Sequence, residues 1–119
     1  RHLATPNRRM LSCFAAGGPL GRGGLGPPPS SHKCRHRAEM GVTIRRRWWG
    51  LGLGRIVVEV LCREALRLGY ERMELQVMEG NTRAVALYER CGFARCGVLP
   101  DAYRTEEGSQ SALLMSKAL

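Results

Sequence analysis

One short stretch decides the fold of this chain, Trp48-Trp49-Gly50-Leu51-Gly52-Leu53-Gly54-Arg55. Its three glycines alternate with leucines, and apolar residues at helical spacing follow at once, beginning with Ile56 and Val57. Glycine allows a tight turn and lets a ligand approach the backbone closely. The unpaired N–H groups at the start of a helix attract anions. The stretch therefore predicts a main-chain binding site for phosphate groups.

Strands are predicted on both sides of this glycine loop. Apolar and polar residues alternate from Arg37 to Arg45 and again from Met73 to Met78, as is typical of strands. A helix is expected from Leu53 to Leu68, with Gly69 as its C-terminal cap. A strand–helix–strand unit of this length predicts parallel pairing and a right-handed crossover. We expect the buried stripe of the helix to consist of Ile56, Val57, Val60, Leu61, Ala65 and Leu68.

The C-terminal part of the chain predicts a second helix and an antiparallel strand pair. Asn81 is a suitable N-cap for a helix from Thr82 to Cys91, which Gly92 would close. Residues 93–99 are expected to form a strand that pairs with residues 111–117, with a polar, turn-rich segment over 100–110. The predicted fold class is therefore α/β (α+β) with a mixed sheet.

The N-terminal part differs from the rest in composition. Residues 1–31 are rich in Gly, Pro, Arg and Ser, and only 11–16 suggest a short strand. Gly17 to Ser31 contains too few large apolar side chains to offset its ordering entropy, so we expect a mobile loop. The expected organisation is a flexible segment over 1–31 and a folded domain over 32–119.

The formal net charge of +9 comes from the same region. Residues 1–47 hold ten Lys or Arg and one acidic residue, whereas residues 48–119 hold nine of each sign. Such a basic run is more often a solvated arm than a specific reader of nucleic acid, although nucleic-acid binding stays open as a third-ranked function. No apolar run approaches the roughly 20 residues that a membrane helix needs, so no membrane span is expected.

The five cysteines are odd in number and form no C-x-x-C pair. This usage favours reduced thiols and a cytoplasmic location over a disulfide framework. Cys62 is predicted to be a small core residue. His32, Cys34 and His36 lie close in sequence but lack the further ligands of a zinc site, so no metal is predicted.

Three segments together resemble the GCN5-related N-acetyltransferases, the GNAT family. They are Gly50-Leu51-Gly52-Leu53-Gly54, Gly80-Asn81-Thr82-Arg83-Ala84-Val85-Ala86-Leu87-Tyr88-Glu89-Arg90-Cys91-Gly92-Phe93, and Leu113-Leu114-Met115-Ser116-Lys117. Their order and spacing are similar to those of the family from about Arg37 to the C terminus. The resemblance implies an acyl-CoA N-acyltransferase fold with acetyl-CoA as cofactor. It also implies transfer of the acetyl group to a primary amine of a small molecule, an amino acid or a protein N terminus.

The resemblance implies a role for several residues. The backbone N–H groups of Leu51, Gly52, Leu53, Gly54 and Arg55 would bind the pyrophosphate. The strand residues Val42, Thr43 and Ile44 would pair with the pantetheine arm as an added strand does, and the sheet would splay there. Asn81 would hydrogen-bond near this arm. Tyr88 would protonate the leaving thiolate, and Glu39 would deprotonate the amine.

Structural alternatives remain open for three of these residues. Tyr88 could be a core tyrosine, Asn81 is a natural N-cap without any ligand, and Glu39 could form a surface ion pair with Arg37.

The sequence departs from the family pattern in two places. Trp49 occupies a position that is usually Gln or Arg, and the usual first strand and two helices are not recognisable. These elements form much of the acceptor pocket. A second copy in a homodimer would be one way to complete it, and an acetyl-CoA-binding module without transfer is the alternative function.

Overall fold

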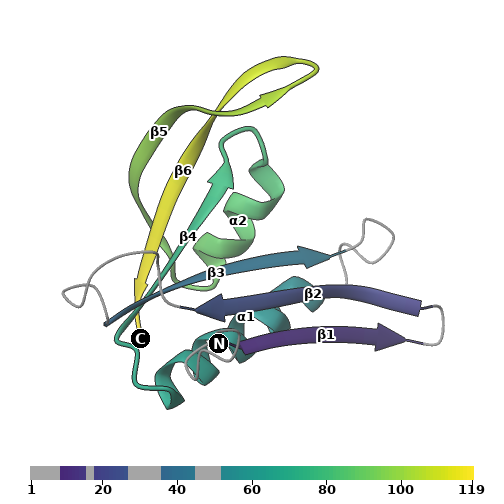
Figure 1. The fold of residues 1–119 in the computed structure, drawn as a ribbon, viewed down its shortest axis with the longest axis vertical. Helices are drawn as coiled ribbons and strands as arrows, with labels where there is room; N and C mark the ends of the chain where they lie inside the picture. The colour runs from purple at the N-terminus through teal and green to yellow at the C-terminus, as the bar shows by residue number, and fades with distance from the viewer. Residues whose placement is uncertain (1–8, 16–17, 27–35, 45–51) are drawn as a thin grey trace, which may run out of the picture.

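The computed structural model describes residues 9–15, 18–26, 36–44 and 52–119. Figure 1 shows their arrangement. The elements in chain order are β1 (Arg9–Ala15), β2 (Gly18–Gly26), β3 (Arg37–Ile44), α1 (Leu53–Arg67), β4 (Arg72–Met78), α2 (Thr82–Arg90), β5 (Ala94–Thr105) and β6 (Gly108–Ala118).

The described strands form one mixed sheet in the order β1-β2-β3-β4-β6-β5. Only β3 and β4 are parallel neighbours, and α1 is the crossover between them. The other neighbouring strands pair antiparallel, including β5 with β6 as predicted. The predicted mixed α/β fold is therefore confirmed. Neither helix in the described part of the chain is long and apolar enough to cross a membrane.

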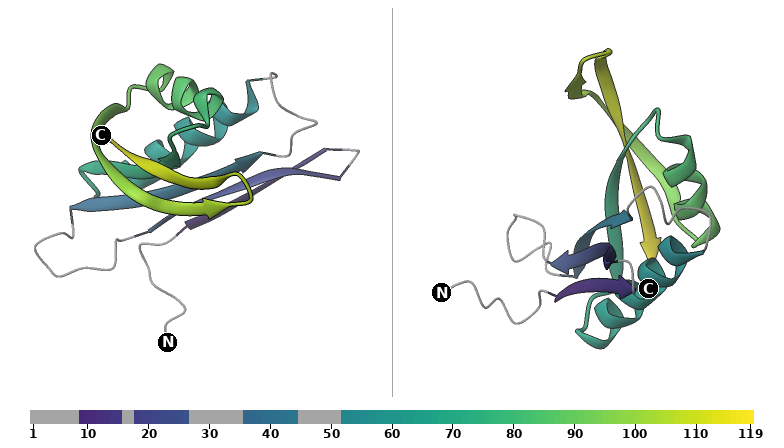
Figure 2. Two further views of the ribbon diagram at one scale, coloured as in Figure 1. Left: turned by 90° about the horizontal axis from the view of Figure 1, so that it is seen from above. Right: turned by 90° about the vertical axis from the view of Figure 1, so that its right-hand side faces the viewer.

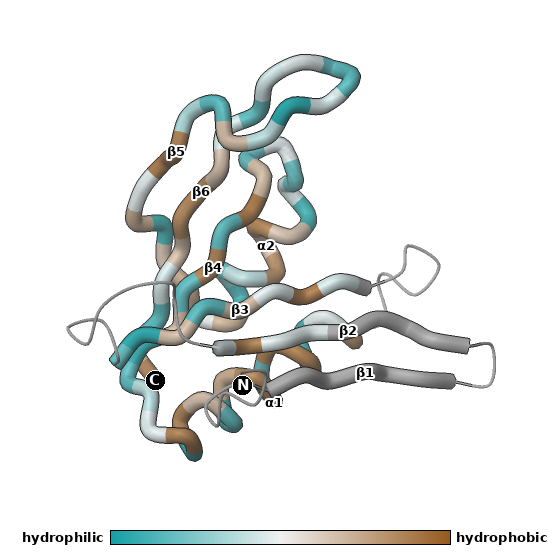
Figure 3. Tube along the Cα trace, in the orientation of Figure 1, coloured by the Kyte–Doolittle hydropathy of each residue, from teal (hydrophilic) through white to brown (hydrophobic). Residues whose placement is uncertain are grey.

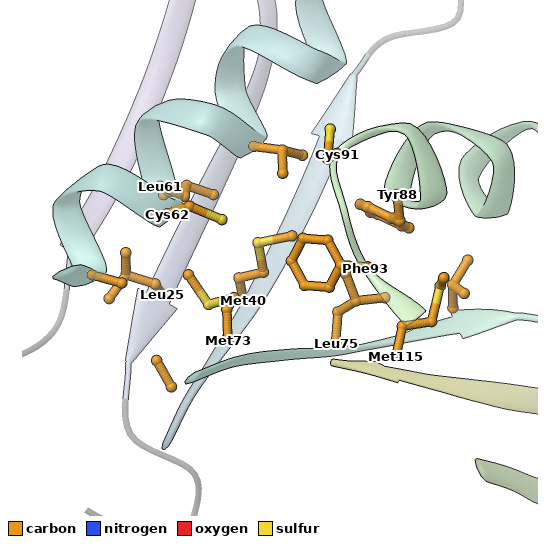
Figure 4. Packing of buried hydrophobic residues seen from close by; sticks show 14 of the residues in the cluster. Leu25, Met40, Leu61, Cys62, Met73, Leu75, Tyr88, Cys91, Phe93 and Met115 are labelled. Atoms are coloured by element: carbon orange, nitrogen blue, oxygen red, sulfur yellow. The ribbon is translucent and has the colours of Figure 1, made fainter. Parts of the chain in front are cut away.

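Both helices cover the same face of the sheet (Figure 2). One buried cluster lies between them and the strands, and it includes Met40 of β3, Leu61 of α1, Leu75 of β4 and Tyr88 of α2 (Figure 4). A strand whose apolar residues alternate and a helix with one apolar side both bury their apolar side chains when the helix packs on the sheet. On the opposite face, no helix among the described residues covers the strands. We call this opposite side the open face.

The buried stripe of α1 is rotated relative to the prediction. The buried residues are Val57, Val58, Leu61, Cys62 and Ala65, whereas Ile56 is 56% exposed and Val60 is only half-buried. The side chains of Val57 and Leu61 lie against β2 at Gly23, and Val58 and Cys62 belong to the same buried cluster, so the stripe is wider than a single helical row predicts. The prediction for Cys62 as a core residue is confirmed.

The prediction of a mobile loop over Gly17–Ser31 is wrong for residues 18–26, which form β2. This strand pairs on one side with β1 and on the other with β3. It needs few large side chains because Leu25 is buried and Gly23 lets α1 approach closely: a Cβ added at Gly23 would lie 3.0 Å from both Leu61 Cδ1 and Val57 Cγ1. Glycine here serves close packing, which composition alone does not distinguish from flexibility.

The hairpin of β5 and β6 is longer than predicted, because strand pairing continues through most of the segment 100–110. Its far end is hydrophilic (Figure 3) and projects beyond α2 (Figure 1). β5 is an edge strand with two register shifts, one between Arg95 and Gly97 and one between Leu99 and Tyr103. An edge strand tolerates Pro100 and polar residues that a central strand would not.

Gly23→Ala is expected to lower the free energy of unfolding by about 1 kcal/mol, because the added methyl group overpacks the contact with α1. Gly41→Ala is the matched control, since an added Cβ there has no atom within 4 Å. Urea unfolding followed by circular dichroism measures both variants. Equal stability of the two variants would show that β2 does not pack closely on α1.

Stability is also expected to decrease at alkaline pH. Burial raises the pKa of the Cys62 and Cys91 thiols above the ordinary value of 9.0. The unfolded chain therefore loses these protons at lower pH than the folded chain. The stabilisation is complete below the unfolded pKa and decreases as the pH rises through the folded pKa. Urea unfolding between pH 7 and 10 should show this decrease, and it should be smaller in the double variant Cys62→Ala/Cys91→Ala.

Candidate functional site

The parallel strands β3 and β4 pair over a short distance and then separate. Only Arg37, Ala38 and Glu39 of β3 face partners on β4, which are Arg72, Met73 and Glu74. At the end where the two strands pair, which we call the closed end, the carbonyl of His36 accepts hydrogen bonds from the amides of Glu71 and Arg72. Beyond Glu39, β3 continues beside β2, while β4 stays paired with β6 along its whole length. We call this separation the fork, and it confirms the predicted splay (Figure 1).

Past the fork, one backbone edge of β3 has no partner strand among the described residues. The other edge of the same segment pairs with β2, from Glu39↔Gly26 to Ile44↔Gly21. Since alternate residues of a strand direct their N–H and C=O groups to opposite edges, the free edge offers donors and acceptors to an extended ligand. Val42, Thr43 and Ile44, which we predict to contact pantetheine, lie in this segment.

The first amides of α1 have no hydrogen-bond acceptor among the described residues. Gly52 is its N-cap with φ 78°, and its carbonyl accepts the first helical hydrogen bond, from Ile56 N at 3.2 Å. Within the described residues, the amides of Leu53, Gly54 and Arg55 donate no hydrogen bond, and no side chain caps this end. Such a terminus suits an anion. Leu51 and the rest of the stretch before Gly52 lie outside the described residues.

Gly54 has a second role that the sequence analysis missed. A Cβ at this position would lie 2.8 Å from Leu87 Cδ2, so its glycine lets α1 pack closely on α2. The alternation Gly52-Leu53-Gly54 therefore combines two requirements, a left-handed backbone at Gly52 and close helix packing at Gly54. Nothing in the sequence separates the two, because each is satisfied by the same residue type.

Asn81 is the N-cap of α2, as predicted. Its side-chain oxygen accepts a hydrogen bond from the amide of Ala84 at 3.2 Å. The capping bond uses only the carbonyl end of the side chain, and the NH₂ group is a donor on an exposed residue. The capping role is thus established, and it is compatible with the predicted contact to a ligand.

Tyr88 lies on the helix face of the fork. It is 7% exposed and packs edge-to-face on Phe93, with the ring centroids 6.0 Å apart. It shares the buried cluster with Met40 and Leu75, the residues directly beyond the last paired positions of the fork (Figure 4). Burial is the main cause that raises the pKa of the Tyr88 phenol above its ordinary value of 10.0. The phenol is therefore protonated at neutral pH.

Glu39 lies on the other side of the sheet. Its neighbours Ala38 and Met40 are buried under the helices, so the side chain of Glu39 projects from the open face. The predicted alternative, an ion pair between Glu39 and Arg37, does not form: Arg37 binds Glu74 instead, with Nε–Oε2 and Nη2–Oε1 both at 2.6 Å. Within the described residues, the Glu39 carboxylate makes no ion pair.

The structure brings the start of α1 against the helix that carries Tyr88. Gly54 contacts Leu87, the residue before Tyr88, so the start of α1 meets α2 close to this tyrosine. Glu39 and Tyr88 approach the fork from opposite faces of the sheet. The side chain of Arg55 points elsewhere, since its Nε lies 3.3 Å from Glu59 Oε2 on the exposed side of α1.

Comparison with known proteins gives a consistent result. A sequence model of the acetyltransferase (GNAT) family matches residues 2–93, so the similarity begins further toward the N terminus than the motifs indicate. The ribosomal protein bS18-alanine N-acetyltransferase of Escherichia coli is 35% identical over 65 residues, 55% of this chain and 44% of that protein. The mycothiol acetyltransferase of Geodermatophilus obscurus is 51% identical over 49 residues, 41% of this chain and 16% of that protein. The chain therefore spans less than half the length of these two relatives.

Solved structures match almost the whole chain. The ribosomal-protein-alanine N-acetyltransferase from Brucella melitensis superposes with a TM-score of 0.87 at 25% identity, covering 96% of this chain and 70% of that one. The Salmonella typhimurium protein yncA, solved with its cofactor acetyl-CoA, has the same fold, with a TM-score of 0.89 at 22% identity over 98% of this chain and 68% of that one. From the sequence match over residues 2–93 together with these superpositions, the chain belongs to the acetyltransferase (GNAT) family.

Proposed function

We propose that this chain binds acetyl-CoA at the fork and transfers its acetyl group to a primary amine. The observation that carries the proposal is the separation of β3 from β4 beside the open start of α1. A free strand edge suits the two amide groups of a pantetheine arm, and unpaired helix amides suit a pyrophosphate. The residues present therefore fit both halves of the cofactor, which supplies an activated acetyl thioester when bound.

The proposed binding residues follow from this fit. The amides of Leu53, Gly54 and Arg55, with those of Leu51 and Gly52, would hold the pyrophosphate. The backbone of Val42, Thr43 and Ile44 would pair with the pantetheine arm. The NH₂ group of Asn81 would donate a hydrogen bond near the same arm, while its oxygen stays on the helix cap.

In the proposed reaction, Glu39 and Tyr88 move protons. An acceptor ammonium must lose one proton before its nitrogen attacks the thioester carbon, and Glu39 accepts this proton and passes it to solvent. As the new C–N bond forms and the C–S bond breaks, Tyr88 donates its proton to the sulfur. The nitrogen then releases its second proton, which replaces the one lost by Tyr88 through solvent. The buried environment of Tyr88 supports this role because it keeps the phenol protonated.

The acceptor is proposed from its chemistry. Glu39 on the open face suits a cationic primary amine, such as a small amine, an amino acid or a protein N terminus. The two relatives, one named for an alanine of ribosomal protein bS18 and one named for mycothiol, are compatible with either a protein or a small molecule as acceptor. Because no described helix covers the open face, a second candidate function is binding of acetyl-CoA without transfer. Mass-spectrometric detection of acetylated product across an amine panel separates the two functions.

Acetyl-CoA is expected to bind with a dissociation constant in the micromolar range, roughly −8 kcal/mol. Gly52→Ala should weaken this binding about tenfold, because a side chain disfavours the left-handed backbone that aims the helix amides at the ligand. Gly69→Ala is the matched control: its φ is 97°, and it lies at the opposite end of α1. Isothermal titration calorimetry that shows equal loss of affinity in both variants would contradict the proposed phosphate site.

Tyr88→Phe should lower kcat about a hundredfold while the acetyl-CoA dissociation constant stays within a factor of about two, because only the proton donor is removed. Tyr70→Phe is the control, since Tyr70 is a similarly buried tyrosine beyond the far end of α1. Steady-state kinetics and calorimetry give the two constants. A parallel loss of affinity and kcat in Tyr88→Phe would indicate a packing role instead.

A further inference from the structure

The chain folds back on Tyr88 where α2 ends. Gly92 has a left-handed backbone, with φ 97°, and its amide donates to the carbonyl of Glu89 at 3.1 Å. The amide of Phe93 donates to the carbonyl of Tyr88 at 3.0 Å. These two bonds define a Schellman motif, in which the residue after the glycine commonly makes an apolar contact with the last turn of the helix. Here that contact joins the rings of Phe93 and Tyr88, whose planes are inclined by 65° (Figure 4).

Lys117 of β6 holds this turn from the sheet. Its side chain lies on the helix face, because its register partner is the buried Met73 of β4. Its Nζ donates a hydrogen bond to the carbonyl of Cys91, the C-cap of α2, at 2.7 Å. The same Nζ lies over the Phe93 ring, 6.0 Å from the centroid. Cations bind the last carbonyls of a helix and are attracted to the faces of aromatic rings. One ammonium group therefore holds both the end of α2 and the ring that packs on Tyr88.

Gly92 leaves room for this lysine as well as forming the turn. A Cβ added at Gly92 would lie 3.3 Å from Lys117 Cε and 3.5 Å from Lys117 Nζ. The ammonium group forms no ion pair within the described part of the chain, so its bond to the carbonyl of Cys91 is not shared with a carboxylate. The two contacts of Lys117 at the end of α2 are thus specific to this turn.

We propose that Lys117 and Phe93 are positioning residues that hold the Tyr88 phenol where it reaches the sulfur of the leaving thiolate. This inference rests on the proposed role of Tyr88 as proton donor. A proton donor must lie within hydrogen-bond distance of the atom that it protonates, and a small displacement of such a group lowers the rate strongly. Lys117 and Phe93 act on the reaction through Tyr88, and neither is proposed to touch the thioester or the acceptor nitrogen.

The ring signals of the tyrosines test the positioning directly. The chain contains three tyrosines, Tyr70, Tyr88 and Tyr103. In NMR spectra of the chain labelled with ¹³C-tyrosine, the signal that Tyr88→Phe removes belongs to Tyr88. Lys117→Met should move this signal, because the Phe93 ring loses its anchor, whereas the other two tyrosine signals should stay in place. Lys117→Arg should restore the original signal, since a guanidinium also donates to carbonyls and stacks on aromatic rings.

Steady-state kinetics test whether the positioning matters for transfer. Lys117→Met should lower kcat about tenfold while the acetyl-CoA dissociation constant stays within a factor of about two, because the proton donor is displaced and the cofactor contacts are not. Lys117→Arg should keep kcat within a factor of about two of the original. When Tyr88→Phe is already present, Lys117→Met should lower kcat by less than about a further factor of two, since the group that it displaces is absent.

Arg72→Met is the matched control. Arg72 Nη2 donates to Ser116 Oγ at 2.7 Å, so this variant also removes a partly buried bond of a cation at the same end of the sheet, but on the open face. The Tyr88 ring signal should not move in it. Thermal unfolding by circular dichroism establishes that each variant is folded. Where Lys117→Met does not fold, Lys117→Leu decides by the same criteria.

The outcomes separate this inference from the proposed function. If the chain transfers no acetyl group, or if Tyr88→Phe keeps its kcat, the proposed role of Tyr88 fails and the inference fails with it. If Tyr88→Phe is slow but Lys117→Met keeps either its kcat or its Tyr88 signal, the proton donor stands and the positioning is overturned. The positioning is also overturned if Lys117→Arg behaves like Lys117→Met, if Arg72→Met moves the Tyr88 signal equally, or if Lys117→Met lowers kcat equally with and without the Tyr88 hydroxyl.

Discussion

The short parallel pairing of β3 with β4 is the constraint on which the rest of the structure depends. Each of these strands has another neighbour that it follows further: β3 pairs with β2 up to Ile44, and β4 pairs with β6 over all of its residues. The sheet therefore divides beyond Glu39 and Glu74 into two halves that share only the closed end of the fork. Buried side chains, Phe93 among them, pack on the helix side and keep the two halves in one core (Figure 4).

The packing of the two helices places the start of α1 relative to the fork. Gly54 permits the contact with Leu87, and this contact brings the start of α1 and the middle of α2 together. The two chemical environments at the fork then follow from the two faces of the sheet. The helix face is apolar and holds a neutral phenol, while the open face is polar and holds the charged residues. A proton donor and a proton acceptor with different environments are what an acyl transfer from a thioester to an amine requires.

Sequence patterns predicted the elements that carry a strong period or a cap. The strands β3 and β4, both helices and the N-cap Asn81 are found close to the predicted bounds, and the antiparallel pair β5–β6 is found with longer strands than predicted. Strand β2 was not predicted because its glycines serve close packing. Composition alone does not distinguish such glycines from those of a flexible loop. The burial of Val58 and Cys62 depends on how α1 packs in the tertiary structure, which the period of α1 alone does not contain.

The candidate site likewise divides into features that the sequence predicts and features that depend on tertiary contacts. The proposed phosphate loop and the proposed roles of Tyr88 and Glu39 follow from local sequence and from the family resemblance. The Arg37–Glu74 pair joins residues on two strands, and a single sequence does not reveal the register that makes it diagonal rather than direct. The second role of Gly54 likewise depends on a tertiary contact.

The central claim is that an extended cofactor completes the free edge of β3 and the start of α1. A titration of the ¹⁵N-labelled chain with coenzyme A, followed by amide chemical shifts and hydrogen exchange, tests it most directly. The account predicts that the largest shifts and the strongest new protection occur in residues 40–44 and 53–55, with β1 and the far end of the β5–β6 hairpin unchanged. Saturable binding that leaves the amides of these two segments unaltered would contradict it.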